Sequence, residues 1–334
     1  TTEIYTLSLH DALPIFRHAF NKAASRRSTL TAAETYMEGS PLMDRREFCK
    51  TLTAGLVLPA AAWTAASPSK LVVVRNAAPA ELVRKAVQAL GGMSQFVKKG
   101  QTVLIKPNIG WDRSPEQAAN TNPEAVAEVV RICFEAGASR VRVVDRTCNQ
   151  AQRCYSRSGI EKAAAAAGAQ VRHIIDSRFK EVAIPQGVLL KSWPLYLDVL
   201  EADVFINMPV AKHHSISQYT LGFKNLMGVM GGDRGSIHNK FMTKIVDINS
   251  AVKPTLTIID AYRVMLRNGP TGGSLADVAE KKTVIAGVDR VAVDAYGMTL
   301  FGVKPEQVEY LRLASERGLG QLDLSRVSIE EING

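Results

Sequence analysis

Lysine, histidine and asparagine side chains are concentrated in one glycine-rich stretch of the chain, residues 202–238. It opens with an apolar run at 204–206, which predicts a buried parallel strand. Polar side chains follow that run: Asn207, Lys212, His213, His214, Lys224, Asn225, Asp233, Arg234 and His238. The interspersed glycines allow tight turns whose backbone N–H groups can face a ligand. The stretch therefore predicts a site for a small anionic or metal-bound molecule.

Three lysines could hold the anion in such a site, namely Lys106, Lys212 and Lys224. Ammonium groups bind phosphate or carboxylate, and a lysine removed from water could also act as a base or form an imine. We assign Lys212 and Lys224, with His213, as catalytic residues. Each lysine taken singly could equally be a solvated surface residue.

His213 and His214 are adjacent, and adjacent side chains on an extended backbone point to opposite sides. One of the two is expected to face the site, and we assign His213 as proton carrier or metal ligand, since a neutral imidazole can serve as either. His213, His238 and Asp260 would form a shell for a divalent metal ion. The alternative is that these are loop histidines with ordinary hydrogen bonds. No C-x-x-C or H-x-x-x-H spacing is present, so a structural zinc site is not expected.

Polar residues also follow five predicted strands along the chain: Lys106, Asp145, Asn207, Asp260 and Asp289. In an open parallel sheet, ligands lie at the carboxyl ends of the strands, so we expect these side chains to gather at one rim. Any single one could be polar simply because a strand end meets water. The predicted ligand-binding set is Lys106, Asn108, Asn207, Asn225, Asp145, Asp233 and Arg234.

The pattern of segments predicts the fold that would position these residues. Strands are predicted at 71–74, 102–105, 140–144, 170–175, 204–206, 255–259 and 283–286. Helices are predicted at 79–90, 122–135, 159–167, 239–252, 291–301 and 305–317. This alternation predicts an α/β fold, a largely parallel sheet with helices on both faces, in one domain over residues 67–334. Residues 181–197 are broken by two prolines and a glycine and predict a small inserted β segment.

Residues 1–42 resemble a translated sequencing adapter, and we expect them to be a non-native leader. Residues 43–66 resemble a twin-arginine signal peptide, with Arg45, Arg46, Phe48 and Lys50 before a short apolar stretch. This predicts export to the periplasm, or otherwise out of the cytoplasm, by the twin-arginine machinery. The alternative is an ordinary basic N-terminus leading into an internal helix.

The formal net charge of +9 favours anionic partners. The basic residues are scattered and not gathered into a stripe with interleaved aromatics, so nucleic acid is not an expected partner. No apolar run in the mature region is long enough for a stable membrane span.

Three cysteines lie in the mature region. Cys133 falls on the apolar face of a predicted helix and is expected in the core. Cys148 and Cys154 flank a loop, and in an oxidising compartment we expect them to form a disulfide. The alternative is two free thiols that line the site.

Several motifs, taken in order, resemble the domain-of-unknown-function family numbered 362, over residues 71–320. They are KPN (106–108), INMPVAKHH (206–214), TLGFKNLMGVMGG (220–232), IID (258–260), GPTGG (269–273) and AGVDRVAVDAYG (286–297). The resemblance implies twin-arginine export or fusion to a ferredoxin-like iron–sulfur module. The sequence has no four-cysteine cluster motif, so it does not support an iron–sulfur cluster of its own. The family is also distantly similar to nickel-pincer lactate racemases, an analogy of fold.

These patterns together predict an exported protein that binds a small anionic or metal-bound ligand at the carboxyl ends of its strands. Such a protein could be an enzyme. The alternative is a non-catalytic protein that binds a metal or cofactor and hands it on.

Overall fold

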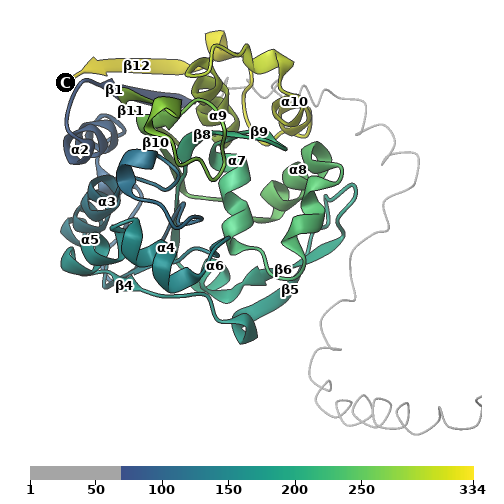
Figure 1. Cartoon of the computed structure of the whole chain (residues 1–334), viewed down its shortest axis with the longest axis horizontal. Coiled ribbons are helices and arrows are strands. Elements are labelled where there is room, and N and C mark those ends of the chain that lie inside the picture. The colour runs from purple at the N-terminus through teal and green to yellow at the C-terminus, as the bar shows by residue number, and fades with distance from the viewer. Residues whose placement is uncertain (1–68) are drawn as a thin grey trace, which may run out of the picture. The chain divides into compact units, whose positions relative to one another are not determined.

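The computed structural model describes residues 69–334, and one ten-stranded sheet runs through them (Figure 1). The strand order is β12-β1-β11-β10-β7-β2-β3-β4, with β8 paired to β10 and β9 paired to β8. The strands are β1 Lys70–Arg75, β2 Thr102–Pro107, β3 Arg140–Val143, β4 Gln170–Val171, β7 Val204–Met208, β8 Val210–His214, β9 Gln218–Thr220, β10 Leu256–Met265, β11 Val278–Gly287 and β12 Ser328–Asn333.

Parallel pairing dominates this sheet. The strands β10, β7, β2, β3 and β4 are parallel to their neighbours in turn, and β12 is parallel to β1. The strand β11 is antiparallel to both β1 and β10. The predicted α/β fold with a largely parallel sheet is confirmed.

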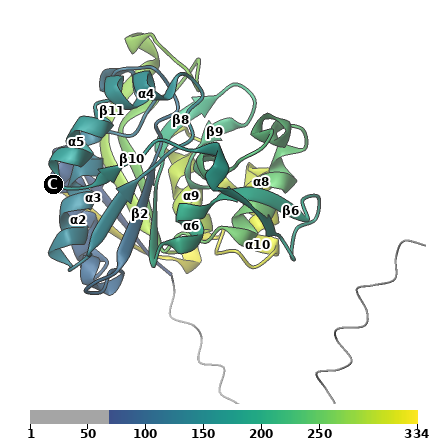
Figure 2. The ribbon, with the colours of Figure 1, turned by 90° about the horizontal axis from the view of Figure 1, so that it is seen from below.

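Helices cover both faces of the sheet, as Figure 2 shows. One face carries α2 Pro79–Ala89, α3 Pro123–Glu135, α4 Ala151–Arg157 and α5 Ile160–Ala166, and the other carries α7 Gly222–Asn225, α8 Phe241–Ala251, α9 Arg290–Thr299 and α10 Glu309–Glu316. Strand residues alternate between two cores: Val103 and Ile105 pack towards α2 and α3, whereas Leu104 packs into the opposite core. This period of two is expected for a strand buried on both sides.

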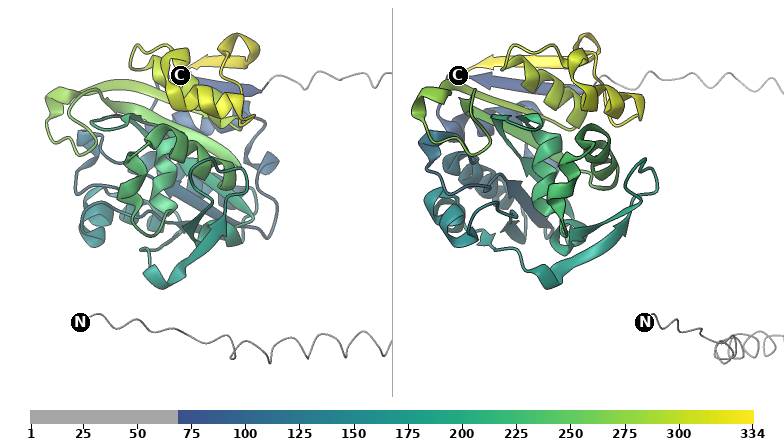
Figure 3. Two further views of the ribbon diagram at one scale, coloured as in Figure 1. Left: turned by 90° about the vertical axis from the view of Figure 1, so that its right-hand side faces the viewer. Right: turned by 45° about the vertical axis from the view of Figure 1, so that its right-hand side comes forward.

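The predicted inserted segment is a separate two-stranded antiparallel hairpin of β5 Phe179–Ala183 and β6 Ser192–Tyr196. Figure 3 shows it in teal, on the side of the described unit opposite β1 and β12. The short helix α6 Leu197–Glu201 links the hairpin to β7. Single 3-10 turns lie at Met93–Gln95, Pro115–Gln117, Asp176–Arg178, Leu226–Val229, Arg234–His238, Leu275–Asp277, Pro305–Gln307 and Leu324–Arg326.

Several element boundaries differ from prediction. The strand expected at 170–175 has only the two residues of β4, and the helix expected at 305–317 is a 3-10 turn followed by α10. The strands β8, β9 and β12 were not predicted. Pro209 has no N–H for the ladder, so it divides β7 from β8, and the sequence reads as a loop beyond it.

The predicted leader and twin-arginine segment, 1–66, lie outside the described residues, so export stays a prediction. Within residues 69–334, no helix combines the length and the apolarity that crossing a bilayer requires.

Candidate functional site

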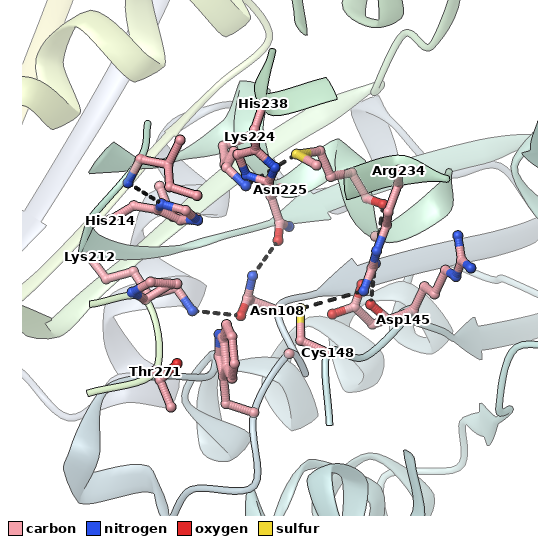
Figure 4. A pocket seen from close by; sticks show the side chains of 18 of the residues that line it. Asn108, Asp145, Cys148, Lys212, His214, Lys224, Asn225, Arg234, His238 and Thr271 are labelled. Atoms are coloured by element: carbon pink, nitrogen blue, oxygen red, sulfur yellow. Dashed lines mark hydrogen bonds between the residues drawn. The ribbon is translucent and has the colours of Figure 1, made fainter. Parts of the chain in front are cut away.

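A pocket of about 460 Å³ lies where β2, β3 and β8 end (Figure 4). The element α7, the 3-10 turn Arg234–His238 and the loop at Pro270 and Thr271 complete its walls. Five cationic side chains and one carboxylate line it: Lys106, Arg146, Lys212, Lys224, Arg234 and Asp145. Part of the predicted set of polar side chains therefore lies together at one rim of the sheet, as expected.

The carboxylate in the pocket is paired with one lysine. Lys106 Nζ lies 2.8 Å from Asp145 Oδ1, and both side chains are buried. The ammonium also donates to Asn225 Oδ1 at 2.9 Å and to Pro107 O at 2.6 Å. Burial lowers the pKa of Lys106, and the Asp145 carboxylate opposes that shift. Lys106 and Asp145 thus form a mutually compensated charge pair in the wall of the pocket.

Gly228 makes room for this pair. A Cβ atom at that position would lie 1.8 Å from Asp145 Oδ1 and 2.3 Å from Lys106 Cε. Any side chain there would displace the ion pair, so the glycine is required by close approach.

Lys212 is equally buried but has no acidic partner. Its Nζ donates to Asn108 Oδ1 at 3.1 Å and to Ala119 O, and among residues 69–334 no carboxylate forms an ion pair with it. The Trp111 ring centroid lies 6.0 Å away. Burial lowers the pKa of Lys212 to about 7, so a large fraction of this amine is neutral near neutral pH.

Three asparagines connect the floor of the pocket. Asn108 Nδ2 donates to Asn225 Oδ1 at 3.0 Å, and Asn225 Nδ2 donates to Asn207 Oδ1 at 2.8 Å. Asn108 and Asn225 line the pocket, whereas Asn207 lies behind them and donates to Gly222 O. Asn207 thus fixes the orientation of the Asn225 amide, which faces the cavity.

Lys224, His214 and His238 form another part of the pocket wall. Burial lowers the pKa of Lys224 to about 8, and its ammonium lies 5.6 Å from the Phe241 ring centroid. The rings of His214 and His238 stack with centroids 5.6 Å apart. Burial, and then the charge of Lys224, lower the pKa of His214 to about 2. Its Nδ1 accepts from the backbone N–H groups of Ile216 and Ser217, so His214 is neutral with its proton on Nε2.

Arg234 fixes the loop that follows β3. Its guanidinium donates to the carbonyl oxygens of Arg146 and Thr147 and lies 3.4 Å from Cys148 Sγ. These acceptors are uncharged, so the positive charge of Arg234 is not neutralised by a carboxylate.

The expected disulfide between Cys148 and Cys154 is absent, and both thiols are free. Cys148 lies exposed on the loop and contacts Arg234, whereas Cys154 is buried on α4 with its Sγ 3.7 Å from Gly110 O. The two thiols contact different parts of the structure. Of the alternatives, the structure has two free thiols, and only Cys148 lines the pocket.

His213 lies outside the pocket, and His214 lines it instead. Lys212 and His214 share one side of β8, and the side chain between them points to the other side, where His213 Nδ1 accepts from Gly269 N at 3.2 Å. The assignment of His213 as the histidine of this site is corrected by this alternation.

Three predicted acidic residues are also elsewhere. The buried Asp260 carboxylate accepts from the backbone N–H groups of Asn122 and Tyr262, and burial raises its pKa to about 6. Asp289 caps α9; because β11 is antiparallel, this residue lies at the opposite rim of the sheet. Asp233 is exposed before the Arg234–His238 turn and does not line the pocket.

The predicted metal ligands His213, His238 and Asp260 are therefore not brought together, since only His238 lines the pocket. In the part of the chain that the structure describes, no group of three or more histidine, cysteine, aspartate or glutamate side chains is placed to hold a metal ion. Trp111, Arg146, Met227 and Thr271 line the pocket and were not predicted. The one sequence signal for Arg146 as a pocket residue is its position directly after Asp145.

The model of a domain-of-unknown-function family, DUF362, matches residues 103–299, which include every residue that lines the pocket. The chain belongs to the DUF362 family. A thylakoid-associated protein of Synechocystis sp. is 27% identical to this DUF362 chain over 245 residues, which are 71% of this chain and 74% of that protein.

Two solved structures are similar in part to this DUF362 chain. The lactate racemase apoprotein of Thermoanaerobacterium thermosaccharolyticum is 11% identical with a TM-score of 0.46, and a Thermotoga maritima protein is 11% identical with a TM-score of 0.40. They match 69% and 71% of this chain, which spans 56% and 59% of theirs. Similarities of this size carry no information about a substrate.

Proposed function

We propose that this DUF362 chain binds a small organic anion in the pocket at the ends of β2, β3 and β8. The observation that carries the proposal is the charge balance of the walls. Besides Lys212, four cationic side chains face one carboxylate, and that carboxylate is already paired with Lys106. A bound anion would supply the missing negative charge.

The other walls suit a small organic molecule. A cavity of about 460 Å³ falls within the range of small-molecule sites, which combine apolar walls with a few polar groups. Trp111 and Met227 supply apolar surface, and the amides of Asn108 and Asn225 can orient a ligand. Lys224 is the cation with the fewest protein partners, so we assign it as the principal contact of the anionic group.

The same pocket contains a group that can move a proton. The pKa of Lys212, about 7, is near the value at which a general base works best in neutral solution. We therefore favour an enzyme over a carrier, with Lys212 as the reactive residue and Lys224 as the anion contact.

Isothermal titration calorimetry with small carboxylates and phosphate esters tests this function. The protein is expected to bind at least one of them saturably, and Lys224→Met is expected to weaken that binding about tenfold through loss of a charge-assisted hydrogen bond. The exposed Lys281→Met is the matched control and should bind as the unaltered chain does. Absence of saturable binding, or equal affinity in the Lys224→Met variant, would contradict the proposal. Recovery of every bound ligand unchanged would favour a carrier.

We further propose twin-arginine export, supported by the order of Arg45, Arg46, Phe48 and Lys50 in the sequence. Replacing both arginines by lysine in a chain expressed from residue 43 should abolish its appearance in the periplasmic fraction. Unchanged export of that variant would contradict this route.

A further inference from the structure

Lys212 is a buried amine without a counter-ion at the wall of an otherwise cationic pocket. Burial is the largest cause that lowers the pKa of Lys212, and the charge of Lys224 lowers it further, while Cys148 and Asp145 oppose the shift. Burial without a carboxylate partner favours the neutral amine, which is the nucleophilic form of lysine. Lys106 has the same side chain in the same pocket, yet the Asp145 carboxylate 2.8 Å away favours its charged form.

The hydrogen bonds of Lys212 leave its lone pair available. A neutral amine has two N–H groups, and Asn108 Oδ1 and Ala119 O accept from the Nζ atom. The remaining tetrahedral position holds the lone pair and has no hydrogen-bond partner among the described residues. Because β8 is paired on both edges, with β9 and β10, the backbone that carries this amine is firmly held.

We propose that Lys212 forms an imine with the carbonyl carbon of an oxo acid whose acid group is bound by the pocket cations. The inference rests on the proposed anion site and deepens it by naming the ligand class. A cationic wall recognises the acid group, and a nucleophilic amine recognises a carbonyl carbon. A molecule that carries both groups is the simplest ligand that uses both features.

The step is balanced without any further reagent. The lone pair of Lys212 Nζ forms a bond to the carbonyl carbon, and the carbon–oxygen double bond becomes a single bond to a hydroxyl group. That hydroxyl then leaves as water while an electron pair on the nitrogen forms the carbon–nitrogen double bond, and the two protons lost by the amine equal the two that the oxygen carries away in the water. The Lys224 ammonium, whose pKa burial lowers to about 8, lines the same pocket and can donate a proton to the departing oxygen.

Borohydride trapping tests this inference with defined probes. The full chain is incubated at pH 7.5 with pyruvate, 2-oxobutyrate or 2-oxoglutarate, reduced with sodium borohydride and analysed by intact mass and peptide mapping. We expect with at least one probe an adduct whose added mass equals that of the probe less one oxygen atom, located on Lys212. Propanoate, which has no oxo group, and acetone, which has no acid group, should give no adduct.

The variant Lys212→Arg has a long basic side chain but no amine that can form an imine, so it should lose the adduct, whereas Lys281→Arg, at an exposed lysine, should retain it. An adduct spread over other lysines, or undiminished in Lys212→Arg, would overturn the inference. If Lys212→Arg does not fold, the site of the adduct in the unaltered chain decides.

Calorimetry with the same probes separates this inference from the function on which it rests. Saturable binding of the oxo acids without any trapped adduct overturns the imine and leaves the anion site standing. Failure of every oxo acid to bind or to be trapped, together with failure of the wider anion panel, overturns both.

Discussion

Two lysines in one pocket, Lys106 and Lys212, are equally buried but differ in what balances their charge. Lys106 is 0% exposed and forms an ion pair with Asp145, whereas Lys212 is 1% exposed and donates only to uncharged oxygens. Removing a charge from water is costly, and a paired charge recovers part of that cost. Lys106 is thereby held as a paired charge, whereas Lys212 is a buried amine without a counter-ion.

The sheet explains the difference. The strands β2 and β3 are parallel neighbours with Ile105 opposite Val143, so Lys106 and Asp145 leave adjacent strands on the same rim. Lys212 is opposite Met265 of β10 and Thr220 of β9, neither of which carries a charge. The neighbouring strand ends therefore supply a carboxylate to Lys106 and none to Lys212.

The largest expected effect is on the free energy of unfolding, when either Lys106 or Lys212 is replaced by methionine. Lys106→Met leaves the Asp145 carboxylate buried without its partner and should lower the free energy of unfolding by roughly 3–5 kcal/mol. Lys212→Met leaves two uncharged acceptors without a donor but also removes the cost of burying an unpaired amine, so these effects offset and the change should be no larger than about 1–2 kcal/mol. Urea denaturation measures both values. Equal decreases in the free energy of unfolding would show that the two lysines do not differ in how their charge is balanced.

Gly228 offers a second way to disturb only the Lys106 side. A methyl group there would meet Asp145 Oδ1 at 1.8 Å, so Gly228→Ala should destabilise the protein by about 1–3 kcal/mol through overpacking. At Gly110, also in the pocket wall, the nearest atom would be 3.4 Å away, so Gly110→Ala is the control. A Gly228→Ala variant as stable as Gly110→Ala would contradict the close packing of the ion pair.

The pH dependence of the free energy of unfolding tests whether Lys212 is neutral in the folded chain. Burial lowers the pKa of Lys212 to about 7 from the ordinary 10.5, so between these pH values the folded chain binds fewer protons than the unfolded chain. Stability contributed by this group therefore rises with pH across that window. Between pH 7.5 and 9.5, the free energy of unfolding should rise by about 2–3 kcal/mol more than it does in Lys212→Met. The same slope in both proteins would mean that Lys212 is already charged when folded.

The two histidines beside Lys212 give the smallest expected effect. His214→Ala should weaken binding of the anion about three- to tenfold, because this ring lines the pocket. His213→Ala should change the Kd by less than about twofold, because this ring lies on the other side of β8. Calorimetry with a ligand found for the unaltered chain compares them, and the reverse order would contradict the orientation of β8.

The strand-end rule located Lys106 and Asp145 from the sequence, because parallel strands share one rim. It failed for Asp289 because the direction of β11 cannot be read from its own residues, and for Asp260 because β10 continues to Met265, so that this residue lies inside the strand. The alternation of side chains already implied that Lys212 and His214, and not His213, share a face. The burial of Lys212 could not be predicted, since it depends on Asn108 and Ala119 on the loop after β2.

Nuclear magnetic resonance titration of lysine labelled with carbon-13 at Cε, with Lys212→Arg used to assign the signal, tests the central contrast most directly. We expect the Lys212 signal to titrate with a midpoint near pH 7. A midpoint near the ordinary value of 10.5 would show that this buried amine stays charged, and it would contradict the account.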